Sequence, residues 1–108
     1  NGFNVVRMAD GTRLLTTGAS GKARSNLTMS IRPERLGLDN AERGTAENRI
    51  RARVLDKTFL GGRVRLTLEA FGGDRLVASL PAASGAVVQP ESLIEMTCFA
   101  ADCRTLTR

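Results

Sequence analysis

The sequence contains no histidine, tryptophan or tyrosine, and four phenylalanines are its only aromatic residues. Without histidine it forms neither a Ser-His-Asp or Cys-His nucleophile arrangement nor an imidazole metal site. Its two cysteines, Cys98 and Cys103, are too few for a four-ligand zinc site, and their spacing differs from the C-x-x-C redox motif. Two interpretations stay open: reduced thiols with Cys98 in the core, or a disulfide formed in an oxidising compartment.

Long apolar segments are also missing. No run of about 18 apolar residues occurs, and no basic-then-apolar leader opens the chain, so we expect neither a spanning helix nor a signal peptide. The first residue is Asn1 rather than methionine, which leads us to expect a piece of a longer protein. The 108 residues are 42% apolar and 25% charged, a composition that predicts one small globular domain.

Positive charge is in excess. Fourteen arginines and two lysines stand against eleven acidic residues, for a net charge of +5. A balance of this sign suits nucleic acid, an anionic membrane surface or an acidic protein, and does not choose among them.

Alternating apolar and polar residues predict short strands rather than helices. We expect strands over residues 3–8, 13–17, 27–31, 49–54, 63–70, 75–80 and 94–98, with a short edge strand at 103–106. Turns are expected at Asp10-Gly11, Gly61-Gly62 and 71–74, loops at 17–26 and 81–90, and one helical turn at 33–36. The predicted fold is therefore all-β, a small OB-fold-like Greek-key barrel of short antiparallel strands, with a small β-sandwich as the alternative.

Five arginines form the most regular charged pattern. Three share one face of the first central strand and two share a face of the next: Arg49, Arg51, Arg53, Arg63 and Arg65. If the two strands pair with these faces aligned, five guanidinium groups crowd one side of a hairpin, and like charges placed opposite one another destabilise a sheet.

Three interpretations of this arginine face stay open. It is a solvated face offset by Asp56, Glu69 or Glu95, a docking surface for an acidic protein, or a nucleic-acid surface. Proteins that bind single strands stack bases on aromatic side chains, and the phenylalanines do not interleave with these arginines, which argues against a nucleic-acid partner.

Catalytic arrangements are not apparent. Four carboxylates lie in one polar stretch, and we expect them to be solvated side chains of a loop: Glu34, Asp39, Glu42 and Glu47. No phosphate-binding glycine motif occurs, because neither Gly61-Gly62 nor Gly72-Gly73 belongs to G-x-x-x-x-G-K-[ST] or G-x-G-x-x-G. We therefore expect this chain to be no enzyme, with no catalytic, cofactor-binding or metal-binding residues of its own.

Several short motifs occur in a characteristic order. Ser30-Ile31-Arg32-Pro33-Glu34 is followed by residues 48–54 (N-R-I-R-A-R-V) and by Phe59-Leu60-Gly61. This order resembles the transport-associated OB (TOBE) domain at the C-terminal end of bacterial ABC importer ATP-binding subunits, of the spermidine/putrescine or ferric-iron type. The resemblance covers residues 28–106, and residues 1–27 look like the preceding hairpin and loop of the same C-terminal region. Residues 85–88 depart from the family pattern, because they lack the acid that many relatives carry there.

The resemblance implies a non-catalytic regulatory and dimerising domain. ATP and magnesium would bind in a preceding ATPase domain, and the partners would be that domain, a second copy of the subunit and the membrane permease. The protein would then be cytoplasmic and peripheral on the inner face of the inner membrane. In some relatives, paired domains of this kind bind a small solute or anion. A stand-alone OB-type module for nucleic acid or a small anion is the alternative function.

Two motif segments supply candidate interface residues. Arg32 and Glu34, on either side of Pro33, would form an ion pair that positions the turn or touches a partner, or would simply end a strand. Phe59 and Leu60, before Gly61, would turn the strand and fill the core, or would form an interface. The five arginines named above are the remaining candidate interface or regulatory residues.

Overall fold

Two β-sheets make up the protein. The structure is a computed structural model and describes residues 3–18, 27–38 and 45–107. One sheet has the strand order β1 (Asn4–Arg7), β2 (Arg13–Gly18), β9 (Cys103–Thr107) and β3 (Leu27–Ile31). The other has the order β4 (Gly37–Leu38), β8 (Leu93–Cys98), β5 (Asn48–Leu60), β6 (Arg63–Ala70) and β7 (Asp74–Pro81). The short helical pieces are η2 (Pro33–Arg35), α1 (Ala82–Ala86) and η4 (Ala100–Asp102).

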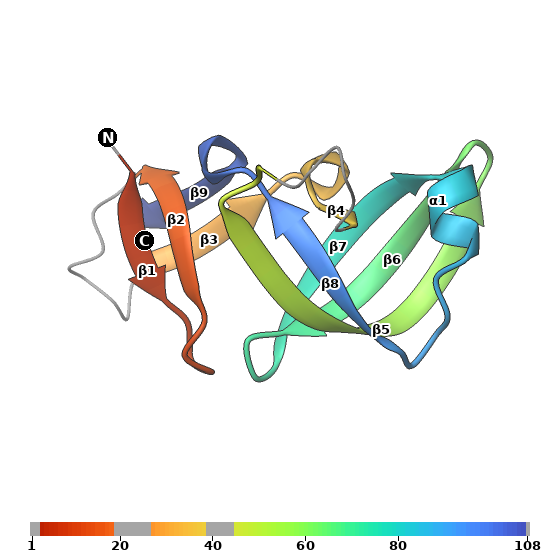
Figure 1. The fold of residues 1–108 in the computed structure, drawn as a ribbon, viewed down its shortest axis with the longest axis horizontal. Coiled ribbons are helices and arrows are strands. Elements are labelled where there is room, and N and C mark those ends of the chain that lie inside the picture. Colours follow the sequence, from red (N-terminus) through yellow and green to blue (C-terminus); the bar gives the residue numbers. More distant parts are fainter. Residues whose placement is uncertain (1–2, 19–26, 39–44, 108) are drawn as a thin grey trace.

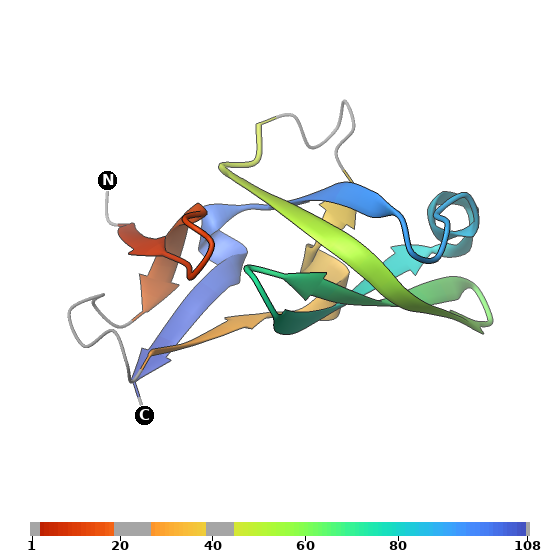
Figure 2. The same cartoon turned by 90° about the horizontal axis from the view of Figure 1, so that it is seen from below.

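The sheets lie side by side along the long axis of the molecule, which measures 39 Å. Figure 1 and Figure 2 show both chain ends at the four-stranded sheet, with α1 and the β5–β6 turn at the opposite end. The five-stranded sheet curls so that its outer strand β7 contacts η2. The all-β, OB-like prediction is confirmed.

Several local predictions are also confirmed. Gly11, in the turn between β1 and β2, has φ +94°, and Pro33 opens the expected helical turn. Gly61 and Gly62 form the two-residue turn between β5 and β6, and Gly61 has φ +67°, which an L side chain rarely adopts.

Three features differ from expectation. The last strand, β9, is not an edge strand, because it lies between β2 and β3. It pairs with β2 in parallel, although only antiparallel strands were expected. The expected loop at 81–90 contains α1, which Pro81 precedes and the small residues Ala82, Ala83 and Ala86 allow. Residues 19–26 of the expected loop lie outside the described residues.

Small and medium aliphatic side chains form one core. The members come from both sheets: Leu14, Leu36, Ile50, Ala52, Val54, Val64, Leu66, Leu68, Ala70, Phe71, Ala78, Leu80, Val88, Met96, Cys98 and Cys103. In the first half of β5, residues alternate between the two faces of the sheet. The even-numbered residues are buried and contribute to the core, and the odd-numbered residues are exposed.

A β-bulge at Leu55 interrupts that alternation. The pairing of β5 with β6 runs from Ala52 to Val54 in one register and resumes at Asp56 in another. After the bulge, Lys57 lies opposite Leu66 and Phe59 opposite Val64, so the odd-numbered residues now share the inner face. The bulge thus turns a lysine and a phenylalanine toward the inner side at the far end of the sheet.

Asn48 links the two sheets through its side chain. Its amide oxygen accepts a 2.7 Å hydrogen bond from the backbone N–H of Leu15, and its amide nitrogen donates a 2.8 Å bond to the Leu15 carbonyl. The side chain is buried, and it satisfies both backbone groups of one residue in β2. The neighbouring Glu47 carboxylate accepts a 2.8 Å bond from the Ala100 N–H, at the start of η4.

We expect Asn48→Ala to lower the free energy of unfolding by about 2–4 kcal/mol, since it leaves both polar groups of Leu15 without their partner. Asn48→Asp should be as unstable at pH 7, because a carboxylate accepts from the N–H but repels the carbonyl. Once protonated, the introduced carboxyl can donate to that carbonyl, so its pKa should be raised in the folded state. Stability should then be recovered as the pH falls.

Urea unfolding at pH 7 and pH 4.5 measures both variants. Gln89→Ala, at an exposed position, is the control and should leave stability nearly unchanged. Equal stability of Asn48→Ala and the unmodified chain would contradict the linking role.

Gly85 lets α1 pack directly on β6. A Cβ at this position would lie 2.6 Å from the Val64 Cβ, closer than any ordinary contact. We expect Gly85→Ala to destabilise the chain by about 1–3 kcal/mol through overpacking. Gly62→Ala is the matched control, because its Cβ would meet no atom within 4 Å. Thermal unfolding of the two variants tests the contact, and equal losses would show that α1 does not constrain Val64.

Candidate functional site

The five arginines do not form one cluster. Arg49, Arg51 and Arg53 pair across to β8, where they face Thr97, Glu95 and Leu93. Arg65 and Arg63 lie near the other end of β5, opposite Thr58 and Leu60. All five lie on the outer face of the sheet, so the faces align, but the two groups stand near opposite ends of β5 and do not crowd together.

Acidic side chains alternate with the arginines on the outer face of the five-stranded sheet. The Arg53 guanidinium lies 3.2 Å from the Glu69 carboxylate, and Arg75 is opposite Glu69 on the next strand. Both members of the Arg53–Glu69 pair are well exposed, so water and salt screen the attraction. This half of the sheet is the mixed-charge surface that one of our three interpretations described.

An open groove of about 510 Å³ lies beside these charges. Its lining includes Asp10, Arg51, Arg53, Glu69, Phe71, Gly72, Gly73, Glu91 and Leu93. Phe71 and Glu91 both have positive φ, at 58° and 70°, which is uncommon for residues other than glycine. Hydrogen bonds from the Thr12 hydroxyl and backbone N–H hold the pKa of the Asp10 carboxyl below its ordinary value. The groove thus mixes charges of both signs.

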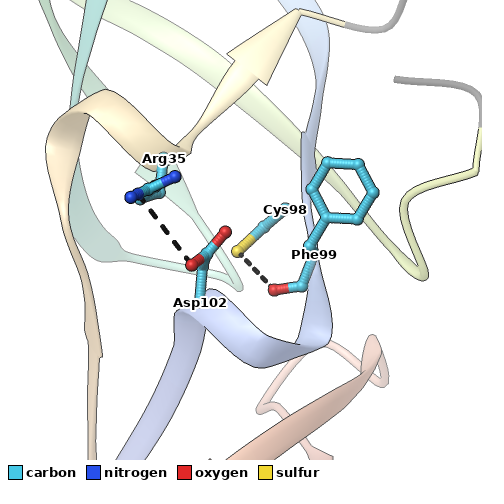
Figure 3. Close-up of polar contacts among 4 residues, drawn as sticks. All are labelled: Arg35, Cys98, Phe99 and Asp102. Atoms are coloured by element: carbon cyan, nitrogen blue, oxygen red, sulfur yellow. Dashed lines mark hydrogen bonds and ion pairs between the residues drawn. The ribbon is translucent and has the colours of Figure 1, made fainter. Parts of the chain in front are cut away.

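Arg32, just before η2, and Glu34, its middle residue, are both exposed, and no ion pair joins them in the described part of the chain. Of our two interpretations, the ion pair is not formed, whereas the strand does end just before Pro33, since β3 stops at Ile31. Instead, the Arg35 guanidinium lies 3.9 Å from the Asp102 carboxylate and connects η2 to η4 (Figure 3). Contact of Arg32 or Glu34 with a partner stays a prediction.

Phe59 and Leu60 do not fill the core. They are 60% and 50% exposed, beside the Gly61-Gly62 turn. Core packing was one of two interpretations, and the exposed fractions contradict it. Phe59 lies on the inner face opposite the buried Val64, but β8 pairs with β5 only as far as Arg53, so this part of β5 is a sheet edge; Leu60 is on the outer face.

Lys57 was not singled out from the sequence, yet it joins two elements. Its ammonium donates hydrogen bonds of 3.0 Å to the Ala86 carbonyl and 2.8 Å to the Val88 carbonyl, at the end of α1. The same ammonium lies 5.3 Å from the centre of the Phe59 ring. The residue between the two carbonyls, Val87, is 73% exposed. The interruption of the alternation at Leu55 was the one sequence feature that could have located Lys57.

The two cysteines meet where the chain passes from one sheet to the other. Both are thiols and both are buried, and the Cys98 Sγ lies 3.4 Å from the Phe99 carbonyl (Figure 3). A hydrogen bond with Cys98, together with burial, holds the pKa of the Cys103 thiol far above its ordinary value. The position is that of a core residue, as one of our two interpretations held.

The described ranges hold neither a metal-binding group of side chains nor a helix able to span a membrane. No three histidine, cysteine, aspartate or glutamate side chains within residues 3–18, 27–38 and 45–107 gather to hold a metal ion. In the same ranges, the helices lack the length and hydropathy that crossing a bilayer requires.

Residues 29–106 match the family model of the TOBE domain. The chain belongs to the TOBE domain family. This confirms the family resemblance at the level of the domain.

Among solved structures, this TOBE domain is similar to the cytoplasmic molybdate-binding protein ModG, in a crystal form with molybdate bound. The TM-score is 0.70 at 15% sequence identity, over 91% of this chain and 78% of that one. At this identity the likeness concerns the fold. A comparison with curated protein sequences found no match.

We expect Cys98 and Cys103 to react slowly with Ellman's reagent in the folded protein. Burial blocks access, and the raised pKa keeps the Cys103 thiol protonated, while attack requires the thiolate. Both thiols should react at once in 6 M guanidinium chloride. Reaction of one thiol per chain within seconds in native buffer would contradict this arrangement.

Proposed function

We propose that this TOBE domain is the non-catalytic C-terminal part of an ATP-binding subunit of a bacterial ABC importer. Membership of the TOBE family over residues 29–106 carries the proposal. ATP and magnesium would bind in a preceding domain, and this domain would regulate that domain and hold two subunits together. The subunit would act in the cytoplasm, attached to the membrane through its permease.

The joining of the N-terminal hairpin to the TOBE part supports this arrangement. β2 pairs with β9, and Leu15 binds the Asn48 side chain, so the segment before residue 29 is part of the same folded unit. These contacts link the β1–β2 hairpin to both β5 and β9.

Surface side chains rather than a buried site would carry the interactions. Phe59 and Leu60 at the hairpin tip are exposed, as are Arg63 and Arg65 beside them. Arg32, just before η2, and Glu34, within it, are exposed as well. Import of a polyamine or of ferric iron is the finer part of the proposal, and it rests on the motif resemblance alone.

The natural reading frame upstream of Asn1 tests the proposal. We expect a G-x-x-x-x-G-K-[ST] motif a few hundred residues earlier, between a strand and a helix. In the purified subunit, removal of residues 1–108 should leave basal ATP hydrolysis and reduce stable dimer formation, measured by sedimentation. A reading frame that starts near Asn1, or a dimer that is equally stable without the domain, would refute the importer role.

A small-oxyanion module is the second candidate, favoured by the likeness in fold to a molybdate-binding protein. Calorimetric titration of the chain with sodium molybdate tests it, with sodium chloride at equal ionic strength as the control. Micromolar binding would favour the anion module, and no heat at millimolar molybdate would remove it. Binding to single-stranded RNA that weakens steeply with salt would instead indicate a nucleic-acid module.

A further inference from the structure

The second half of β5 has a neighbouring strand on one side only. β8 pairs with β5 as far as Arg53, and the backbone of Val54 is the last to bond the segment before β8, through Glu91 and Ser92. From residue 55 to residue 60 only β6 pairs with β5, so this stretch, which we call the β5 edge, is an open margin of the five-stranded sheet. It lies at the opposite end of the molecule from both chain ends (Figures 1 and 2).

Two residues of the β5 edge direct their backbone polar groups away from β6. Leu60 and Arg63 close a two-residue turn and therefore form a hydrogen-bonded pair, and such pairs alternate along an antiparallel ladder. Thr58 then bonds to β6, whereas the N–H and C=O groups of Lys57 and Phe59 point outward. No strand among the described residues lies beside these four groups. Donors and acceptors left open in this way are a template for a further strand.

The β5 edge is complementary to a second copy of itself. When two copies pair antiparallel about a two-fold axis at Thr58, Lys57 of each copy lies opposite Phe59 of the other. Each of these two pairs exchanges two hydrogen bonds, so four bonds satisfy every outward-pointing group of both edges. The contact closes on itself, because the same residues serve on both sides of the axis.

The side chains fit the same register. On the inner face, Lys57 would lie beside Phe59 of the second copy, a contact like the one its ammonium already makes, at 5.3 Å, with the Phe59 ring of its own chain. On the outer face, Thr58 would face its counterpart, a favourable cross-strand pair. Asp56 would lie opposite Leu60, so no two like charges face one another. Phe59 and Leu60, which are 60% and 50% exposed in a single copy, would each gain a cross-strand neighbour.

The features that usually keep sheet edges apart are weak at this margin. Edge strands are commonly blocked by proline, by an inward-pointing charge or by a bulge. The β5 edge contains no proline, and the bulge at Leu55 comes before the residues that would pair. Its inward-pointing charge, Lys57, is held by hydrogen bonds to the Ala86 and Val88 carbonyls. The outer strand on the other side of the sheet, β7, is by contrast in contact with η2.

We propose that two copies of the chain associate through their β5 edges, antiparallel about Thr58, into one continuous sheet. The inference deepens the dimerising role proposed above and, in the full subunit, rests on it. The two fail separately, because a chain that is monomeric or paired elsewhere overturns the β5 pairing and leaves the test of the upstream ATPase motif unaffected.

Cysteine cross-linking tests the register. Residues that face one another in a non-hydrogen-bonded antiparallel pair have Cα atoms about 4.5 Å apart, within the range that a disulfide spans. Thr58→Cys should therefore form a disulfide-linked dimer in a buffer of reduced and oxidised glutathione, measured on a non-reducing gel. Asp56→Cys is the matched control, because it is exposed on the same face but would lie opposite Leu60. It should cross-link about tenfold more slowly or less.

A charge at residue 59 tests the cross-strand pair. In the dimer, Phe59→Lys would place a cation opposite each Lys57, whereas Phe59→Glu would place an anion there. Sedimentation equilibrium at rising protein concentration should show the dissociation constant raised about tenfold or more in Phe59→Lys and changed by less than about threefold in Phe59→Glu. The amide spectrum of each variant checks that it is folded.

Three results would overturn the proposal. A chain that remains monomeric at 1 mM does not pair through this edge. Equal cross-linking of Thr58→Cys and Asp56→Cys would exclude the register about Thr58. Dimers that persist unchanged in Phe59→Lys, or that are lost equally in Phe59→Lys and Phe59→Glu, would assign the association to a surface other than the paired β5 edges.

Discussion

The Asn48 side chain joins the two sheets, because from β5 it hydrogen-bonds the backbone N–H and carbonyl of Leu15 in β2. Its amide oxygen accepts from the Leu15 N–H and its amide nitrogen donates to the Leu15 carbonyl, the two hydrogen bonds that a residue of a neighbouring strand would otherwise form. Asn48 is also the first residue of β5, the longest strand, and the adjacent Glu47 binds the start of η4. The placement of β2, η4 and β5 relative to one another thus follows from two consecutive residues, and the core between the sheets forms around that junction.

The bulge at Leu55 is the second constraint, and it explains why the two halves of β5 differ. Before the bulge, alternation buries apolar side chains and leaves arginines in water. After it, the phase shifts by one residue, so Lys57 and Phe59 lie on the inner face, opposite the core residues Leu66 and Val64. A lysine there needs acceptors, and the two carbonyls at the end of α1 provide them. The bulge thus connects β5 to the end of α1 through Lys57, although the two segments lie far apart in sequence.

Alternation and turn residues sufficed to predict most strands, because each of those features acts within a few residues. Asp10-Gly11 and Gly61-Gly62 marked their turns correctly, and Pro33 marked its helical turn. Predictions that required pairing between distant segments were less successful. β9 proved to be internal because β2 and β3 both pair with it, and Arg63 lies far from Arg49 because register, not face, decides which residues meet. Exposure of Phe59 could not be predicted either, since it depends on where β8 stops pairing with β5.

The distribution of charge follows from the same geometry. In the first half of β5, two arginines have an acidic neighbour on an adjacent strand: Arg51 is opposite Glu95 of β8, and Arg53 pairs with Glu69 of β6. Beyond the end of β8, only β6 pairs with β5; there Asp56 lies one row from Arg65 on the outer face, and Arg63 donates hydrogen bonds to the side chain and carbonyl of Ser79. Exposing Phe59 and Val87 in that same region costs solvation free energy. The Lys57 bonds to the Ala86 and Val88 carbonyls and the bond from Ala82 to Gly62 tie α1 to this end of the sheet, where Phe59 and Val87 stay exposed.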